Sequence, residues 1–222
     1  MADRGETSLR REIIATALAM SRSGLSHGTS GNVSARWKSG MLITPTGMAY
    51  DRLKPADIVF MDAKGRPAAG RKPSSEWRFH LSAYQARQDA AAIVHCHSRH
   101  ATALACTRRS IPAFHYMVAV AGGDDIPLAG YATFGTDELA RHVAKALAGR
   151  KACLMANHGQ IATGLSLAKA LALAEEVEQL AAQYILALTI GGVKVLPKAE
   201  MTRVLKRFAT YGQQPEARSR KP

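Results

Sequence analysis

Hydrophobic residues recur at helical spacing in both halves of the chain. Apolar residues at positions 9, 13, 14, 17 and 18 share one face and predict an amphipathic helix that ends before Gly24. Positions 77, 81 and 84 share a face in the same way. They predict a helix over about Ser75–Gln88, with Ser74 or Ser75 as its cap.

Two more helices are predicted in the second half of the chain. Thr136 and Asp137 begin an amphipathic segment that stops at Gly149. A longer segment is capped by Ser166, carries an apolar stripe over positions 167–188 and ends at the glycine pair 191–192.

Short apolar runs between these helices predict β-strands. The predicted strands are Val33–Trp37, Met41–Thr44, Ile58–Asp62, Ala91–Cys96 and Ala152–Ala156. Strands that alternate with helices indicate a layered α/β or α+β domain. The sequence has no internal repeat and no linker that would divide it.

Length and composition favour a soluble folded protein. The chain has 222 residues, of which 47% are hydrophobic and 21% charged, so it is long enough for one domain with a substantial core. Its longest apolar stretch, Leu167–Ile190, contains four charged residues, and no segment is expected to cross a membrane. Because the N-terminal residues lack the apolar core of a signal peptide, a cytoplasmic location is expected. The three cysteines are scattered, which argues against a disulfide framework.

The charge balance favours anionic partners. Thirty Lys and Arg against 17 Asp and Glu give a formal net charge of +13. Dense basic clusters occur at positions 10–11, 108–109 and in the tail at 218–221, and most other basic residues are dispersed. This distribution favours a phosphorylated metabolite over nucleic acid as the partner.

Histidines at the ends of two predicted strands are candidate metal ligands. His95 and His97 are two residues apart on a strand, so both imidazoles project from the same face, while Cys96 points the opposite way. His158 follows the second strand beside Gly159, which would allow close approach of the backbone, and Glu76 lies on the helix before the histidine pair. Three imidazoles and one carboxylate form a donor set suited to zinc.

Each of these residues also has a structural interpretation. The histidine pair could be buried and hydrogen-bonded, Glu76 could be an exposed first-turn acid that favours the helix dipole, and His158 could bond loop backbone. The other five histidines, at positions 27, 80, 100, 115 and 142, have no paired geometry and are interpreted as surface or supporting residues.

Hydroxyl and amide residues at turns form a candidate phosphate site. Ser74 and Ser75 at a helix start offer hydroxyls, free backbone N–H groups and the positive end of the helix dipole. Asn32, Thr46 and Gly47 in neighbouring loops could add further donors. Helix capping and ordinary turn chemistry explain the same residues.

Eight stretches that occur in order carry a specific resemblance: GTSGNVSAR, ITPTGM, KPSSEWRFH, IVHCHS, IPAFHYM, YATFGT, ANHG and FATYG. The chain resembles the class II, zinc-dependent aldolase/adducin-like family, and within it the fuculose-phosphate aldolase type, from about position 8 to 212. The resemblance implies a three-layer αβα single domain over residues 1–212, followed by a basic tail at 213–222 that we expect to be disordered. It also implies a homotetramer with active sites between adjacent subunits.

The resemblance assigns roles to individual residues. Glu76, His95, His97 and His158 match the family's zinc ligands, with one Zn²⁺ per subunit, and Glu76 also matches its catalytic base. Tyr116 matches a catalytic tyrosine supplied across the subunit interface. The positions that match phosphate- or substrate-binding residues, or lie close to them, are Thr29, Gly31, Asn32, Thr46, Gly47, Ser74 and Ser75. The positions that match the aldehyde end or the C-terminal segment are Phe134, Phe208 and Tyr211.

The implied activity is that of a lyase. It is the reversible cleavage of L-fuculose 1-phosphate, or a related 5-deoxy or 5-methylthio pentulose 1-phosphate, to dihydroxyacetone phosphate and an aldehyde. A sugar-phosphate epimerase, dehydratase or decarboxylase on the same scaffold is the alternative, and a non-catalytic adducin-like binding module is a remote one. His27 and Asn157 depart from the Gln and His expected for the fuculose enzyme and leave the aldehyde preference open.

Overall fold

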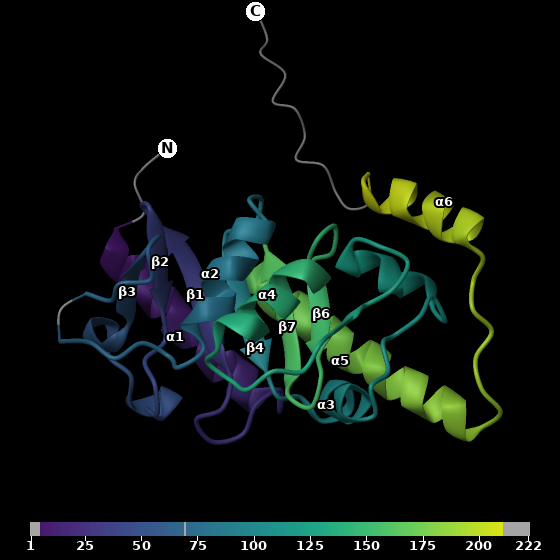
Figure 1. Ribbon diagram of the computed structural model, residues 1–222, viewed down its shortest axis with the longest axis horizontal. Helices are drawn as coiled ribbons and strands as arrows, with labels where there is room; N and C mark the ends of the chain where they lie inside the picture. The colour runs from purple at the N-terminus through teal and green to yellow at the C-terminus, as the bar shows by residue number, and fades with distance from the viewer. Residues whose placement is uncertain (1–4, 69, 211–222) are drawn as a thin grey trace, which may run out of the picture.

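A mixed seven-stranded sheet forms the centre of the molecule. The computed structural model describes residues 5–68 and 70–210, so the predicted tail at 213–222 lies outside the described residues. The strands are β1 (Asn32–Trp37), β2 (Gly40–Ile43), β3 (Val59–Asp62), β4 (Ala92–Cys96), β5 (Leu128–Ala129), β6 (Ala152–Met155) and β7 (Gly159–Gly164). Their order is β3-β2-β1-β4-β7-β6-β5 (Figure 1). Every neighbouring pair is antiparallel except β5 and β6.

Helices cover both faces of this sheet. Helices α1 (Glu6–Arg22), α3 (Arg99–Cys106) and α5 (Leu167–Thr189) share one apolar core with Val33, Val94 and Cys96. Helices α2 (Trp77–Ala86) and α4 (Asp137–Ala146) share a second core with Ile93 and Met41. Because strand side chains alternate between faces, strands such as β2, β4, β6 and β7 contribute to both cores, while β1 contributes Val33 and Ala35 to the first core only. The expected three-layer αβα arrangement of a single domain is therefore confirmed.

Smaller elements complete the chain. Within the described residues, 3₁₀ helices lie at Tyr50–Arg52 (η1), Pro55–Asp57 (η2) and Tyr116–Ala121 (η3). Helix α6 (Lys198–Phe208) follows α5 and packs against η3, away from the sheet (Figure 1). Among the described residues, none of the helices combines the length and the apolar character that crossing a membrane requires.

The predicted helices and strands are present, with ends displaced by a few residues. Thr136 and Ser166 are N-caps whose side chains accept hydrogen bonds from Leu139 N and Lys169 N, and the prediction for Ser166 is thus confirmed. The prediction that Ser74 or Ser75 caps α2 is wrong, because the N-cap position is held by Glu76. Ser74 Oγ instead accepts from the backbone N–H of Glu76 at 3.3 Å, in the turn just before the helix.

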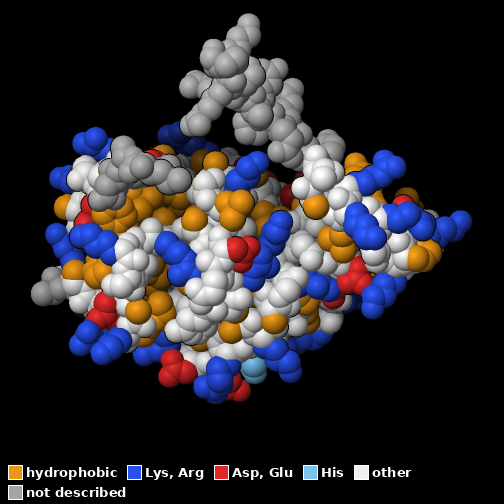
Figure 2. All heavy atoms as spheres, turned by 90° about the horizontal axis from the view of Figure 1, so that it is seen from above, with side chains coloured by type: hydrophobic (Ala, Val, Ile, Leu, Met, Phe, Trp, Pro, Cys, Tyr) orange, Lys and Arg blue, Asp and Glu red, His pale blue; other side chains and the backbone are white. Residues whose placement is uncertain are grey.

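Lysine and arginine side chains are spread over the face seen in Figure 2, with acidic groups between them. On this face the net charge of +13 therefore does not form one concentrated stripe. The dispersal agrees with the expectation of a small anionic ligand rather than a nucleic-acid duplex.

Candidate metal centre and substrate cavity

Two histidine rings meet at the end of β4. His95 lies on the strand and His97 follows it, and their Nε2 atoms are 3.0 Å apart. Cys96, between them, belongs to the opposite core and is fully buried. The alternation predicted from the sequence therefore brings both imidazoles to the α2 side of the sheet.

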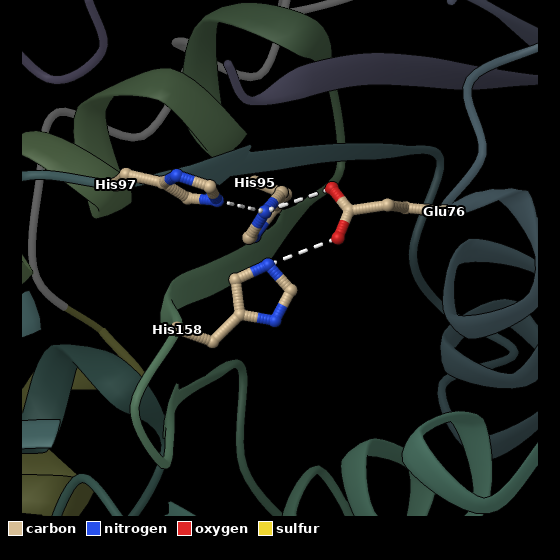
Figure 3. Close-up of side chains that lie close together, drawn as sticks. All are labelled: Glu76, His95, His97 and His158. Carbon is tan, nitrogen blue, oxygen red and sulfur yellow. Dashed lines mark hydrogen bonds and ion pairs between the residues drawn. The ribbon is translucent and has the colours of Figure 1, made fainter. Parts of the chain in front are cut away.

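Glu76 and His158 complete a four-residue cluster (Figure 3). The two carboxylate oxygens of Glu76 lie 3.2 Å from His95 Nε2 and 2.9 Å from His158 Nε2. Glu76 is only 7% exposed, so the interpretation of it as an exposed first-turn acid is wrong. One ligand atom from each residue lies within 4.8 Å of all the others.

The backbone around the cluster sets the direction of the imidazoles. His95 Nδ1 lies 2.8 Å from the carbonyl oxygen of Gln160, so the ring donates there and directs Nε2 toward the cluster. Gly159 permits this close arrangement, since a Cβ at that position would lie 2.4 Å from the Cys96 carbonyl oxygen and 3.0 Å from the His97 ring. Asn157, just before His158, adopts a left-handed φ of 53°, which asparagine tolerates better than most residues.

Burial and charge set the protonation of two cluster members. Burial, together with the neighbouring His95 and His158, lowers the pKa of His97 to about 3, so its ring is neutral near pH 7. For Glu76, burial acts to raise the pKa, but the charge and hydrogen bonds of His95 and His158 outweigh it. The net pKa of Glu76 is well below its usual value, and the group is a carboxylate near pH 7.

This donor set fits a zinc ion. The side chains of Glu76, His95 and His158 are largely buried, so an uncompensated charge there would be costly, and the four ligand atoms all lie within 4.8 Å of one another. Neutral imidazole nitrogens and a carboxylate are the ligands that catalytic zinc sites use. The residues could therefore hold a metal ion.

A cavity of about 430 Å³ opens above the cluster. Its lining includes Glu76, His97 and His158 and every residue expected to bind phosphate, namely Thr29, Gly31, Asn32, Thr46, Gly47, Ser74 and Ser75. Ser30, Asn157, Tyr131 and Phe134 line it too, although Ser30 and Tyr131 were not among the predicted site residues. Among the described residues of this lining, none is a lysine or arginine. An anion here would depend on hydroxyls, amides and the start of α2 rather than on ion pairs.

Two of the remaining predicted residues, Tyr116 and Phe208, lie elsewhere in the chain. Tyr116 is 51% exposed and stacks on Phe208 with ring centroids 6.4 Å apart. Both line a separate cavity of about 930 Å³ between η3 and α6. Tyr211 lies outside the described residues.

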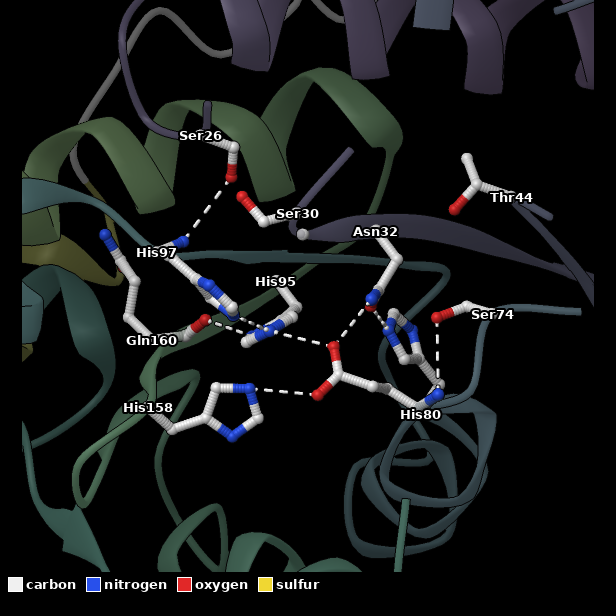
Figure 4. A network of polar contacts seen from close by, with 12 residues as sticks. Ser26, Ser30, Asn32, Thr44, Ser74, His80, His95, His97, His158 and Gln160 are labelled. Atoms are coloured by element: carbon white, nitrogen blue, oxygen red, sulfur yellow. Dashed lines mark hydrogen bonds and ion pairs between the residues drawn. The ribbon is translucent and has the colours of Figure 1, made fainter. Parts of the chain in front are cut away.

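One of the remaining histidines supports the site. Of the two interpretations of His80, surface or supporting residue, the structure agrees with the second, because His80 is fully buried and its Nε2 lies 2.5 Å from Asn32 Oδ1 (Figure 4). Asn32 Nδ2 in turn donates to Glu76 Oε2 at 2.9 Å. The spacing of Glu76, His80 and Tyr84, four residues apart on one helix, is the sequence signal that could have indicated it.

Comparison with known proteins gives a consistent result. Residues 11–185 match the family described as Class II Aldolase and Adducin N-terminal domain. The chain is 56% identical over 205 residues to the L-fuculose phosphate aldolase of Escherichia coli (strain K12), covering 92% of this chain and 95% of that protein. It is 53% identical to a 5-methylthioribulose-1-phosphate/5-deoxyribulose-1-phosphate aldolase of Rhodospirillum rubrum, covering 92% and 93%.

Among solved structures, one of an L-fuculose 1-phosphate aldolase superposes with a TM-score of 0.87 at 45% identity, covering 90% of this chain and 96% of that one. The sequence match spans most of the chain, the sheet and its helical layers agree, and the relatives are named as aldolases. The chain therefore belongs to the class II aldolase and adducin family and is an enzyme of its aldolase branch, a carbon–carbon lyase.

Proposed function

We propose that the enzyme is a zinc-dependent aldolase that reversibly cleaves a ketose 1-phosphate to dihydroxyacetone phosphate and an aldehyde. The observation that carries this proposal is the position of the Glu76 carboxylate. It is buried between two imidazoles at one end of a cavity whose other residues offer hydroxyl and amide groups. L-Fuculose 1-phosphate and the 5-deoxy and 5-methylthio pentulose 1-phosphates are the substrates we propose, because relatives named for them match over nearly the whole chain.

Zinc held by Glu76, His95, His97 and His158 would supply Lewis-acid polarisation of the substrate ketone. Glu76 is the general base in the direction of carbon–carbon bond formation. It takes a proton from the carbon of dihydroxyacetone phosphate that attacks the aldehyde, and it returns that proton in cleavage. The role requires the carboxylate form, which is the ordinary form of a glutamate near pH 7.

Ser74, Ser75, Asn32, Thr46 and Gly47 would hold the substrate phosphate. The phosphate lies far from the bond that breaks, so contacts with it fix the position of the reacting carbons at the base. Thr29 and Gly31 border the same loop, and Phe134, 65% exposed on the same cavity, would meet the aldehyde end.

Tyr116 would donate a proton to the aldehyde oxygen as the new bond forms and remove it in cleavage. Since Tyr116 lines a different cavity from Glu76 within one subunit, we propose that it serves the site of a neighbouring subunit in a homotetramer. Phe208, which stacks on Tyr116, would support its ring there.

Substitution of the base separates this function from simple metal binding. Glu76→Gln keeps an oxygen near the histidines but cannot accept the proton, so the variant should retain much of its zinc and lose turnover by about 10²- to 10⁴-fold. Glu138→Gln, the same change on the exposed first turn of α4, is the matched control. Near-normal dihydroxyacetone phosphate release by Glu76→Gln would remove Glu76 from the base role.

A further inference from the structure

Polar side chains from β1 and α2 interleave beneath the candidate metal centre. Asn32 and Ser34 are two residues apart on β1, and Glu76, His80 and Tyr84 are spaced four residues apart along α2 and its N-cap. Two residues of strand advance about 6.6 Å and four residues of helix about 6 Å, so the two series stay in step. The result is an alternating row in the order Glu76, Asn32, His80, Ser34, Tyr84.

Each neighbour in this row is within hydrogen-bonding distance of the next. Asn32 Nδ2 is 2.9 Å from Glu76 Oε2, and Asn32 Oδ1 is 2.5 Å from His80 Nε2. Ser34 Oγ is 2.8 Å from His80 Nδ1 and 2.9 Å from Tyr84 OH. Asn32, Ser34, His80 and Tyr84 are each at most 3% exposed, so their polar atoms depend on one another.

Only one direction of hydrogen bonding satisfies the row. The Glu76 carboxylate can only accept, so the NH₂ group of Asn32 faces it and the amide oxygen faces His80. His80 must then carry its hydrogen on Nε2. Burial, reinforced by the nearby His95, lowers the pKa of His80 to about 3, which leaves the ring neutral and Nδ1 an acceptor.

The hydrogen bonds of Ser34 and Tyr84 follow from the tautomer of His80. Ser34 donates to His80 Nδ1, and its oxygen accepts from Tyr84, whose phenol burial keeps protonated by raising its pKa. The hydrogen-bond donors therefore all point toward Glu76. A flipped Asn32 amide would set its oxygen against the carboxylate and its NH₂ against the N–H of His80.

We propose that His80 is a positioning residue that locks the Asn32 amide with its NH₂ group toward Glu76, while Ser34 and Tyr84 fix the tautomer of His80. The inference rests on the proposed function, in which Glu76 changes between carboxylate and carboxylic acid. Without the lock, a protonated Glu76 could donate to a flipped Asn32 oxygen and turn its proton away from the substrate. When His80 holds the Asn32 amide in place, the NH₂ group of Asn32 donates to Glu76 whether Glu76 is a carboxylate or a carboxylic acid.

A double-mutant cycle tests whether His80 acts through Asn32. His80→Leu should lower kcat/KM about tenfold or more with zinc content unchanged, because small misplacements of reacting groups cost up to about 10²-fold. Asn32→Ala alone should lower it at least as far, and the double variant should match Asn32→Ala within about twofold. His80→Gln, which can still present an N–H to Asn32, should recover most of the loss. If the fold-losses in kcat/KM of the two single variants multiply in the double variant, His80 and Asn32 act independently and the proposal is overturned.

Two controls separate positioning from general loss of structure. Val143→Ala removes buried side-chain volume from the same core but no polar group of the row, so it should lower the melting temperature and leave kcat/KM near the wild-type value. Histidine-ring ¹⁵N NMR, with His80→Gln identifying the signals, should report a neutral ring protonated on Nε2 in the wild-type enzyme. A ring protonated on Nδ1 would overturn the proposed direction whether or not the enzyme cleaves a ketose phosphate. A correct tautomer in a protein that cleaves none would contradict the proposed function alone.

Discussion

Acid should destabilise this fold through His80. The ring is fully buried, and its pKa is about 3 in the folded chain against a reference value of 6.5. The unfolded chain therefore takes up a proton at His80 as the pH falls below 6.5, while the folded chain does not. The contribution of His80 to the free energy of unfolding is fully present above pH 6.5 and is lost progressively as the pH falls from 6.5 toward 3.

The size of this effect follows from the two pKa values. Each pH unit below 6.5 costs about 1.4 kcal/mol, so the His80 contribution between pH 8 and pH 5 is about 2 kcal/mol. Urea unfolding of the metal-free protein at these two pH values, at one protein concentration, measures the change in the free energy of unfolding.

The comparison with His80→Gln isolates this one group. The variant has no titrating ring at position 80, so between pH 8 and pH 5 it should lose about 2 kcal/mol less than the wild type. His27→Gln, at an exposed histidine, should keep the wild-type dependence because that ring meets solvent in the folded chain as well. An equal loss of stability in wild type and His80→Gln would mean that His80 takes up a proton in the folded state, and the reasoning from burial would be refuted.

Three further substitutions test the site. His95→Ala should weaken zinc binding by more than about 100-fold, since loss of even a supporting partner of a ligand costs 10- to 100-fold; a full zinc complement by metal analysis would contradict its role as a ligand. Tyr116→Phe should slow cleavage by about 10²- to 10⁴-fold with little change in KM, and a pure affinity effect in steady-state kinetics would argue against proton transfer. Gly31→Ala would place a Cβ 2.6 Å from Ser26 Oγ and 2.8 Å from the His95 carbonyl oxygen. It should therefore unfold at a lower temperature than Gly28→Ala, where no atom lies within 4 Å of the added Cβ. Equal melting temperatures would show that the loop before β1 accommodates the Cβ at position 31 without loss of stability.

The parts of the fold that sequence periodicity predicts are those with a strong local pattern. Strand β4 is a continuous apolar run, and alternation along it was enough to predict that His95 and His97 share a face and that Cys96 does not. Strand β7 carries glycine at both ends and no regular alternation, so the pattern did not indicate it. Helix α3 is short and rich in alanine, and it was missed for a similar reason.

The site depends on pairings that local patterns cannot specify. Asn32 lies opposite His95 in the β1–β4 register, which brings a turn residue predicted to bind phosphate next to the four candidate metal ligands. The role of His80 depends on how α2 packs against β1, and His80 is 48 positions away in the chain from Asn32, which it contacts. The four candidate ligands could be named from the sequence because the family motifs contain them. The row that supports Glu76 required the structure.

The most direct test of the proposed function is release of dihydroxyacetone phosphate from L-fuculose 1-phosphate by protein stripped of metal and then reconstituted with zinc. We expect no release from the stripped protein, release after zinc is restored, and no comparable release from zinc-loaded Glu76→Gln. If zinc-loaded wild-type protein releases none from L-fuculose 1-phosphate, nor from the 5-deoxy and 5-methylthio pentulose 1-phosphates, the proposed aldolase reaction is contradicted.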